Sequence, residues 1–119
     1  RKEPRRYEGI KVMKKKKIYH KLVRDRIPEI ITNAAKSHQI RQLRGDELTS
    51  FALKKLREEV QEFVENPCAE EAADIEEILS FICTRLSIKE AAVRAQRISK
   101  RATKGGFDMG FLLEWVDDT

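Results

Sequence analysis

Four carboxylates near the middle of the chain have the spacing expected of metal ligands on two neighbouring helices. They form two acid-x-x-acid pairs, Glu59 with Glu62 and Glu71 with Asp74. Residues three apart on a helix lie on adjacent turns of one face, so each pair can converge on one ion. Four oxygen ligands suit a hard cation, Mg²⁺ with Mn²⁺ as a possible substitute. The spacing therefore predicts a divalent-metal site between two packed helices.

The apolar residues around these acids predict two amphipathic helices. The first carries an apolar stripe of Leu53, Leu56, Val60, Phe63 and Val64. The second carries a stripe of Ile75, Ile78, Leu79, Ile82 and Leu86. At about 100° per residue, both selected pairs lie at or beside these stripes, whereas the neighbouring acids point further away. A chain with 38% charged residues forms such pairs by chance on solvated faces. Two pairs that both flank apolar stripes make chance the weaker interpretation.

The overall charge conceals a basic tail on a mildly acidic body. Residues 1–17 hold nine Lys and Arg against two Glu, and residues 18–119 hold 16 Lys and Arg against 18 Asp and Glu. We therefore expect a tail at 1–17 and a single domain at 18–119. The tail offers an alternative function, a non-catalytic helical module that binds nucleotide or nucleic acid. It has few interleaved aromatics, so nucleic acid is the less favoured partner.

Length, apolar runs and cysteine usage favour a cytoplasmic protein. No apolar run approaches the roughly 18 residues of a spanning helix, so no membrane association is expected. Cys68 and Cys83 are the two cysteines, and they form no Cys-x-x-Cys motif. This pattern gives no indication of a zinc site or of an oxidising compartment.

Capping residues place four helices along the body. Asp25 is the expected cap of the first helix, with Pro28 in its first turn, and Asp46 is the expected cap of the second, which runs to about Glu65. A second acidic helix is expected over 69–86. A capping box at 87–90 then opens a helix that runs to about Thr103. A short extended piece at 40–43 fits the connector before the longest helix. Gly105 and Gly106 end the last helix.

Two further features allow more than one interpretation. The cations Lys21, Arg24 and Arg26 precede the first helix and either bind phosphate or form ordinary surface charge. The apolar segment from Phe107 to Val116 needs a partner surface, either the helices of its own chain or a dimer mate.

Several segments together resemble a known family. YHKLVRDRIPEII, KKLREEVQE, EEAADIEEIL and KRATKGGFDMGFLLE occur in the order seen in the MazG-like all-α nucleoside triphosphate pyrophosphatases. The most similar branch is the small stand-alone one described as predicted house-cleaning pyrophosphatases for non-canonical nucleotides. The resemblance covers residues 18–115. It implies an all-α fold with a four-helix-bundle core, usually completed as a homodimer or a dimer of dimers. It also implies Mg²⁺-dependent hydrolysis of a nucleoside triphosphate to the monophosphate and pyrophosphate.

The resemblance also assigns roles to individual residues. It implies metal ligation by Glu59, Glu62, Glu71 and Asp74, and we add the hypothesis that Glu59 or Glu62 is the catalytic base. It implies phosphate binding by Lys55 with Glu58 adjoining, by Lys100 and by Lys104, and we add Arg24. Phe107 either shapes the base pocket or packs in the core. This chain has a short break of eight residues between its acid pairs, and Lys104 stands where arginine is common. Lysine binds phosphate as a point charge, without the bidentate grip of arginine.

Overall fold

The part of the chain that the structure describes, residues 16–119, is all-helical. In this computed structural model it contains four helices and no strand: α2 (Ile27–Asn33), α3 (Gly45–Glu65), α4 (Ala69–Arg85) and α5 (Glu90–Lys104). The expectation of an all-α protein is therefore confirmed, and the extended piece expected at 40–43 is not a strand. The chain divides into two compact units, Arg1–Ile40 and Arg41–Thr119. None of the described helices is long and apolar enough to cross a membrane.

The first unit contains α2, which starts one residue later than its expected cap predicts. Arg26 occupies the N-cap position without a side-chain capping bond, and Asp25 lies in the preceding turn. The turn closes through Ile27 N to Arg24 O at 3.0 Å, and Arg26 pairs with Glu29 at 2.9 Å. Pro28 stands in the first turn as expected, where its missing N–H costs nothing. The assignment of Asp25 as the cap was therefore wrong.

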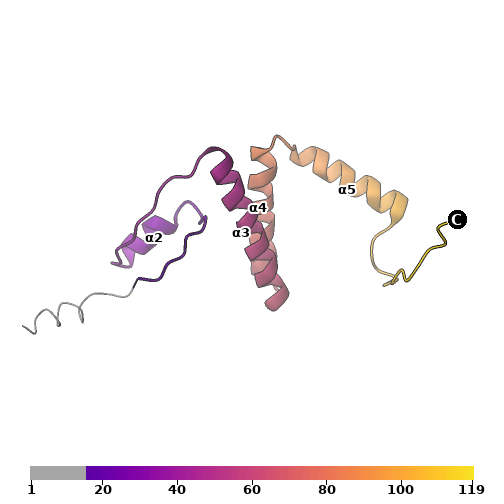
Figure 1. The fold of residues 1–119 in the computed structure, drawn as a ribbon, viewed down its shortest axis with the longest axis horizontal. Helices are drawn as coiled ribbons and strands as arrows, with labels where there is room; N and C mark the ends of the chain where they lie inside the picture. Colours follow the sequence, from indigo (N-terminus) through magenta and orange to yellow (C-terminus); the bar gives the residue numbers. More distant parts are fainter. Residues whose placement is uncertain (1–15) are drawn as a thin grey trace, which may run out of the picture. The chain divides into compact units, whose positions relative to one another are not determined.

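The second unit is built on a hairpin of two antiparallel helices, α3 and α4 (Figure 1). The helix α3 ends at Glu65, as predicted, because Pro67 follows Asn66 and disfavours a helical conformation there. At the opposite end, Arg85 of α4 ties the two helices together. Its Nε donates to Thr49 Oγ1 at 2.8 Å, and its Nη2 donates to the Gly45 carbonyl oxygen at 2.7 Å. Gly45 has φ of +58°, a conformation that favours glycine.

The seam between α3 and α4 is narrower than the apolar stripes predict. Among the described residues, only Ala52, Ile78 and Ile82 form the buried apolar core, and Glu59 is buried beside them. The exposed part of the expected stripe consists of Leu53 at 38%, Val60 at 43%, Val64 at 65%, Leu79 at 43% and Leu86 at 49%. Of the described helices, α3 contacts only α4, and α5 contacts α4 only slightly, so a single narrow line of residues is covered. The apolar stripes seen in the sequence are therefore only partly buried within this chain.

Two helix starts differ from the capping signals. Arg44, not Asp46, occupies the N-cap position of α3, so Asp46 lies in the first turn, where its charge favours the helix dipole. Lys89 occupies the N-cap position of α5, so Ser87 and Glu90 do not form a capping box. Ser87 has φ of +62° and donates its N–H to Thr84 O at 3.2 Å, while Ile88 N reaches Cys83 O at 2.7 Å. These bonds join residues 87 and 88 to the last turn of α4, so neither residue belongs to the start of α5.

The helix α5 and the segment after it pack on little of their own chain. No residue of α5 is buried, and among the described elements it contacts α4 but not α3. Gly105 ends α5 as expected, with φ of +84°. The large apolar side chains that follow are all exposed: Phe107, Met109, Phe111, Leu112, Leu113, Trp115 and Val116. The segment therefore does not cover the helices of its own chain.

Candidate metal centre

Three of the four predicted ligands converge at the end of the hairpin nearest its turn. Glu59 of α3 and Glu71 and Asp74 of α4 each place a carboxylate oxygen within 4.8 Å of the others. They meet because α4 returns antiparallel along α3 immediately after the break. An arrangement of this size can surround one cation, since Mg²⁺–oxygen bonds are about 2.1 Å long. The short break thus brings the two acid pairs together.

Glu59 is the most enclosed member of this cluster. It is only 6% exposed, whereas its spacing from the stripe placed it on the partly open flank. Lys55, one turn earlier on α3, pairs with Glu59 at 3.2 Å and with Glu58 at 2.9 Å. Burial alone lowers the pKa of Lys55, but the hydrogen bonds to Glu58 and Glu59 outweigh it and raise that pKa above 10.5. Lys55 is therefore charged at neutral pH and fixes the Glu59 carboxylate in the seam.

Glu71 carries the electrostatic signature of crowded carboxylates. Its pKa is raised above the ordinary 4.5 by desolvation first, and then by the charges of Glu62, Asp74 and Glu59. A hydrogen bond with Asp74 contributes in the same direction. Glu62, the fourth predicted ligand, contributes to this shift through its charge, but it does not belong to the group of three that converges within 4.8 Å. Like charges held this close destabilise one another unless a cation joins them.

The residues present therefore fit a divalent cation. The donors are all carboxylate oxygens, as Mg²⁺ and Mn²⁺ prefer, and no His or Cys belongs to the group. Lys55 is the ammonium group that the described structure pairs with this cluster, and it already serves two carboxylates. A further positive charge would relieve the repulsion that raises the pKa of Glu71.

The remaining predicted site residues are not gathered around the acids. Lys100 and Lys104 are exposed on α5, which makes no contact with α3. Lys104 and Phe107 instead line a surface hollow of about 530 Å³ with the residues up to Phe111. Phe107 is 97% exposed, so it has no core role in this chain. Arg24 lies in the first unit. The basic tail, residues 1–17, falls almost entirely outside the described residues.

One signal in the sequence could have located Glu59 correctly. Ala52 and Glu59 are seven residues apart and so share one line of α3, and Lys55 and Glu59 have the i,i+4 spacing of a helical ion pair. Both relations make Glu59 a seam residue with its own counter-charge. The stripe of larger side chains concealed this, because Ala52 is small.

Comparisons with family models, with curated proteins and with solved structures find no match to this chain. The functional argument therefore depends on the carboxylates themselves and on the sequence segments quoted above.

Replacing Lys55 with methionine tests its role as the counter-ion of Glu59. In EDTA, Lys55→Met should lower the free energy of unfolding by about 1–3 kcal/mol, because it leaves a buried carboxylate without its partner. Added Mg²⁺ should then raise the melting temperature more in this variant than in the wild type. Lys54→Met, at an exposed position of the same helix, is the matched control. Equal melting temperatures of both variants in EDTA would contradict the role.

The raised pKa of Glu71 gives a pH prediction for the metal-free protein. The folded state binds this proton more tightly than the unfolded state, so the contribution of Glu71 to stability is full below pH 4.5. It is lost as the pH rises through the raised pKa. Chemical unfolding in EDTA across this range should show the loss, and Glu71→Gln should flatten it. A wild-type profile that Glu71→Gln leaves unchanged would refute this prediction.

Proposed function

We propose that this protein is a Mg²⁺-dependent nucleoside triphosphate pyrophosphohydrolase. Its substrate is an NTP or dNTP, including non-canonical ones, and its products are the nucleoside monophosphate and pyrophosphate. The observation that carries the proposal is the convergence of Glu59, Glu71 and Asp74 within 4.8 Å. The MazG-like segments of the sequence favour the same activity. On that resemblance, the active form is a helical bundle completed by a second copy.

The carboxylates explain why the substrate would carry phosphate. A cluster of carboxylates repels a negatively charged triphosphate unless a cation lies between the two. The same ion can therefore be bound by the carboxylates and by the phosphate oxygens. When bound, Mg²⁺ lowers the pKa of a coordinated water and neutralises phosphate oxygens. Glu59, Glu62, Glu71 and Asp74 would hold it. A binder of phosphate alone has no use for four convergent carboxylates.

The two candidate bases differ in their surroundings. Glu59 is buried and paired with Lys55, so it is poorly placed to meet an attacking water. Glu62 is half-buried on the same side of α3. We therefore assign proton acceptance to a carboxylate oxygen of Glu62 and give Glu59 the role of a fixed ligand. The water oxygen attacks the α-phosphorus, the bond to the bridging oxygen breaks, and pyrophosphate leaves.

The cations would position the phosphates. Lys55 already lies at the acid cluster, where its ammonium group can also reach a bound anion. The exposed side chains of Lys100 and Lys104 would bind the β- and γ-phosphates, and so would Arg24. Such electrostatic positioning supplies most of the catalysis in phosphoryl transfer.

Product analysis in labelled water tests the proposal. The full chain is incubated with Mg²⁺ and a panel of canonical and damaged triphosphates in H₂¹⁸O. Attack at the α-phosphorus should place the label in the monophosphate and leave the pyrophosphate unlabelled. A nucleotide- or nucleic-acid-binding module would release no pyrophosphate, and that result across the panel would overturn the proposal. Label in inorganic phosphate would indicate a different phosphatase.

A further inference from the structure

The hairpin has two opposite flanks, and one of them is apolar and exposed. On α3, two exposed apolar residues each follow a buried residue of the seam by one position: Leu53 follows Ala52, and Val60 follows Glu59. On α4, Leu79 follows Ile78 in the same way. Antiparallel helices rotate in opposite senses past a shared seam, so one step forward from it leads to the same side in both. We call this side the apolar flank. Its exposed apolar residues are Leu53, Val60, Val64, Leu79 and Leu86.

The acidic site lies toward the other side of the seam. Glu58 precedes Glu59, Asp74 precedes Ile75, and Phe81 precedes Ile82, so one step backward leads to that side in both helices. The apolar flank can therefore be covered completely while the carboxylates stay open to solvent. The two flanks can serve different partners at the same time.

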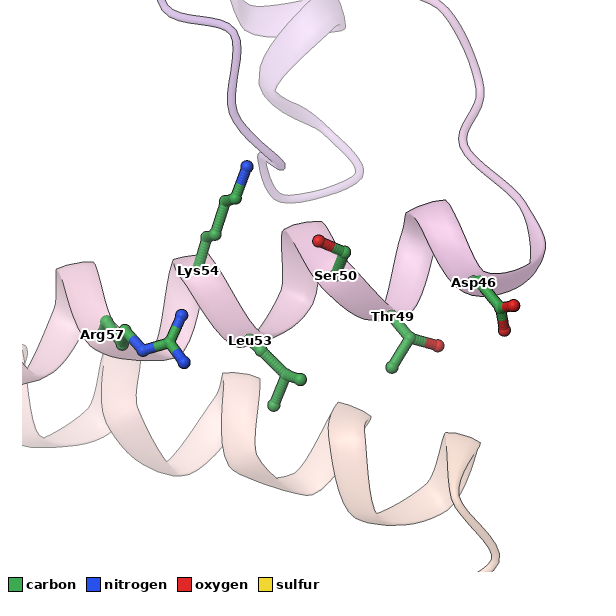
Figure 2. Close-up of a pocket in the computed structure, with 6 residues that line it drawn as sticks. All are labelled: Asp46, Thr49, Ser50, Leu53, Lys54 and Arg57. Carbon is green, nitrogen blue, oxygen red and sulfur yellow. The ribbon is translucent and has the colours of Figure 1, made fainter.

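A shallow groove on α3 forms part of the apolar flank (Figure 2). It has a volume of about 350 Å³ and is lined by Asp46, Thr49, Ser50, Leu53, Lys54 and Arg57. Leu53 lies between Thr49 and Arg57, and Lys54 projects from the other edge of the helix. Arg57 is exposed, and Lys54 lies over the Phe51 ring at 4.8 Å. The lining of the groove thus combines the apolar side chain of Leu53 with two cations, Lys54 and Arg57, and one acid, Asp46.

The C-terminal segment of the same chain has the complementary character. Residues 107–119, which we call the arm, contain seven exposed large apolar side chains, four acids and no Lys or Arg. The acids are Asp108, Glu114, Asp117 and Asp118. Two of the arm's apolar residues, Phe111 and Trp115, are 86% and 79% exposed. A soluble monomer rarely exposes so many apolar groups together.

We propose that the arm of one chain docks on the apolar flank of a second copy, and that the exchange is reciprocal. The arm does not cover its own hairpin, since its large apolar side chains are 68–97% exposed. The arm's acids are opposite in charge to Arg57, which lies beside Leu53 on the flank. Its three aromatic side chains can bury about 150–250 Å² each, so two arms supply much of the roughly 1,600 Å² of a stable interface. The three-residue apolar core of one hairpin also needs such support.

Trp115 is the only tryptophan, so its fluorescence reports the arm directly. In the full chain, dilution from tens of micromolar should convert dimers to monomers in sedimentation velocity. Over the same range, the emission should shift to longer wavelength and become accessible to iodide. An emission that is protected at every concentration would mean docking within one chain and would overturn the proposal. A monomer with exposed Trp115 throughout, or a dimer in which Trp115 stays exposed, would also overturn it.

Two variants on opposite flanks provide the matched test. Leu53 and Phe81 are both 38% exposed, but only Leu53 lies on the apolar flank. Leu53→Glu should weaken association at least tenfold, whereas Phe81→Glu should leave it within about twofold. Arg57→Glu should weaken it as well, and it keeps the test valid if Leu53→Glu fails to fold. Equal association of Leu53→Glu or of Arg57→Glu with the wild type would refute the docking site.

Mixing variants distinguishes exchange between copies from every other arrangement. Leu53→Glu retains an intact arm, and Trp115→Ser retains an intact flank. Each alone should be monomeric at a concentration where the wild type is dimeric, but their mixture should form heterodimers through one intact contact. Absence of any heterodimer in the mixture would overturn the reciprocal exchange.

Discussion

Replacing Asp74 with asparagine should lower Mg²⁺-dependent pyrophosphate release by about two to three orders of magnitude. The amide keeps the volume and shape of the carboxylate but removes one negative charge from the cluster with Glu59 and Glu71. A divalent ion held by fewer anionic oxygens binds more weakly and polarises water less. The rate, measured at saturating triphosphate and increasing Mg²⁺, should fall, and the Mg²⁺ concentration for half-maximal activity should rise.

Glu76→Gln is the matched control for this variant. Glu76 lies two residues further along α4, is exposed, and does not belong to the convergent group. Glu76→Gln removes the same charge from the same helix as Asp74→Asn. Comparison of the two variants therefore distinguishes the loss of a metal ligand from a change in net charge. The helical circular-dichroism signal should be unchanged in both variants. Turnover by Asp74→Asn within threefold of Glu76→Gln would remove Asp74 from the site.

Replacing Ile82 with alanine should cost about 2–4 kcal/mol of stability. Ile82 is 5% exposed and is one of three apolar residues that form the buried core of the described chain. The seam has few other apolar contacts to compensate for the lost methylene and methyl groups, so a cavity or a local collapse follows. Against a typical total of about 5–15 kcal/mol, this loss is large. Urea unfolding of dilute protein, followed by circular dichroism, measures it.

The same substitution on α5 separates burial from helix propensity. Ile98 is 63% exposed, so Ile98→Ala should change the stability of the dilute protein by less than about 0.5 kcal/mol. Both changes replace isoleucine by alanine within a helix, and their intrinsic propensity terms are the same. A cost below 1 kcal/mol for Ile82→Ala would show that the seam is not the main source of stability.

The sequence by itself determined the helices and the pairing of the acids. Periodicity and the break at Pro67 placed the end of α3 and both ends of α4 within a residue of those observed, whereas the capping signal at Asp46 placed the start of α3 two residues late. The acid-x-x-acid spacing predicted that two pairs of carboxylates converge between the helices; Glu59, Glu71 and Asp74 do so, whereas Glu62 does not belong to the convergent group. These properties are local, because backbone geometry repeats every few residues and does not depend on what packs against it.

Only the tertiary structure decided which face of each helix is buried. The apolar stripes are wide enough for several seams, and the packing of α3 on α4 selected the one through Ala52 and Glu59. That choice buried a carboxylate, gave it Lys55 as a counter-ion, and left Leu53 and Val60 exposed. A helix with one neighbour can hide only one line of side chains. The position of that line depends on the partner helix, which a pattern read along one segment does not contain.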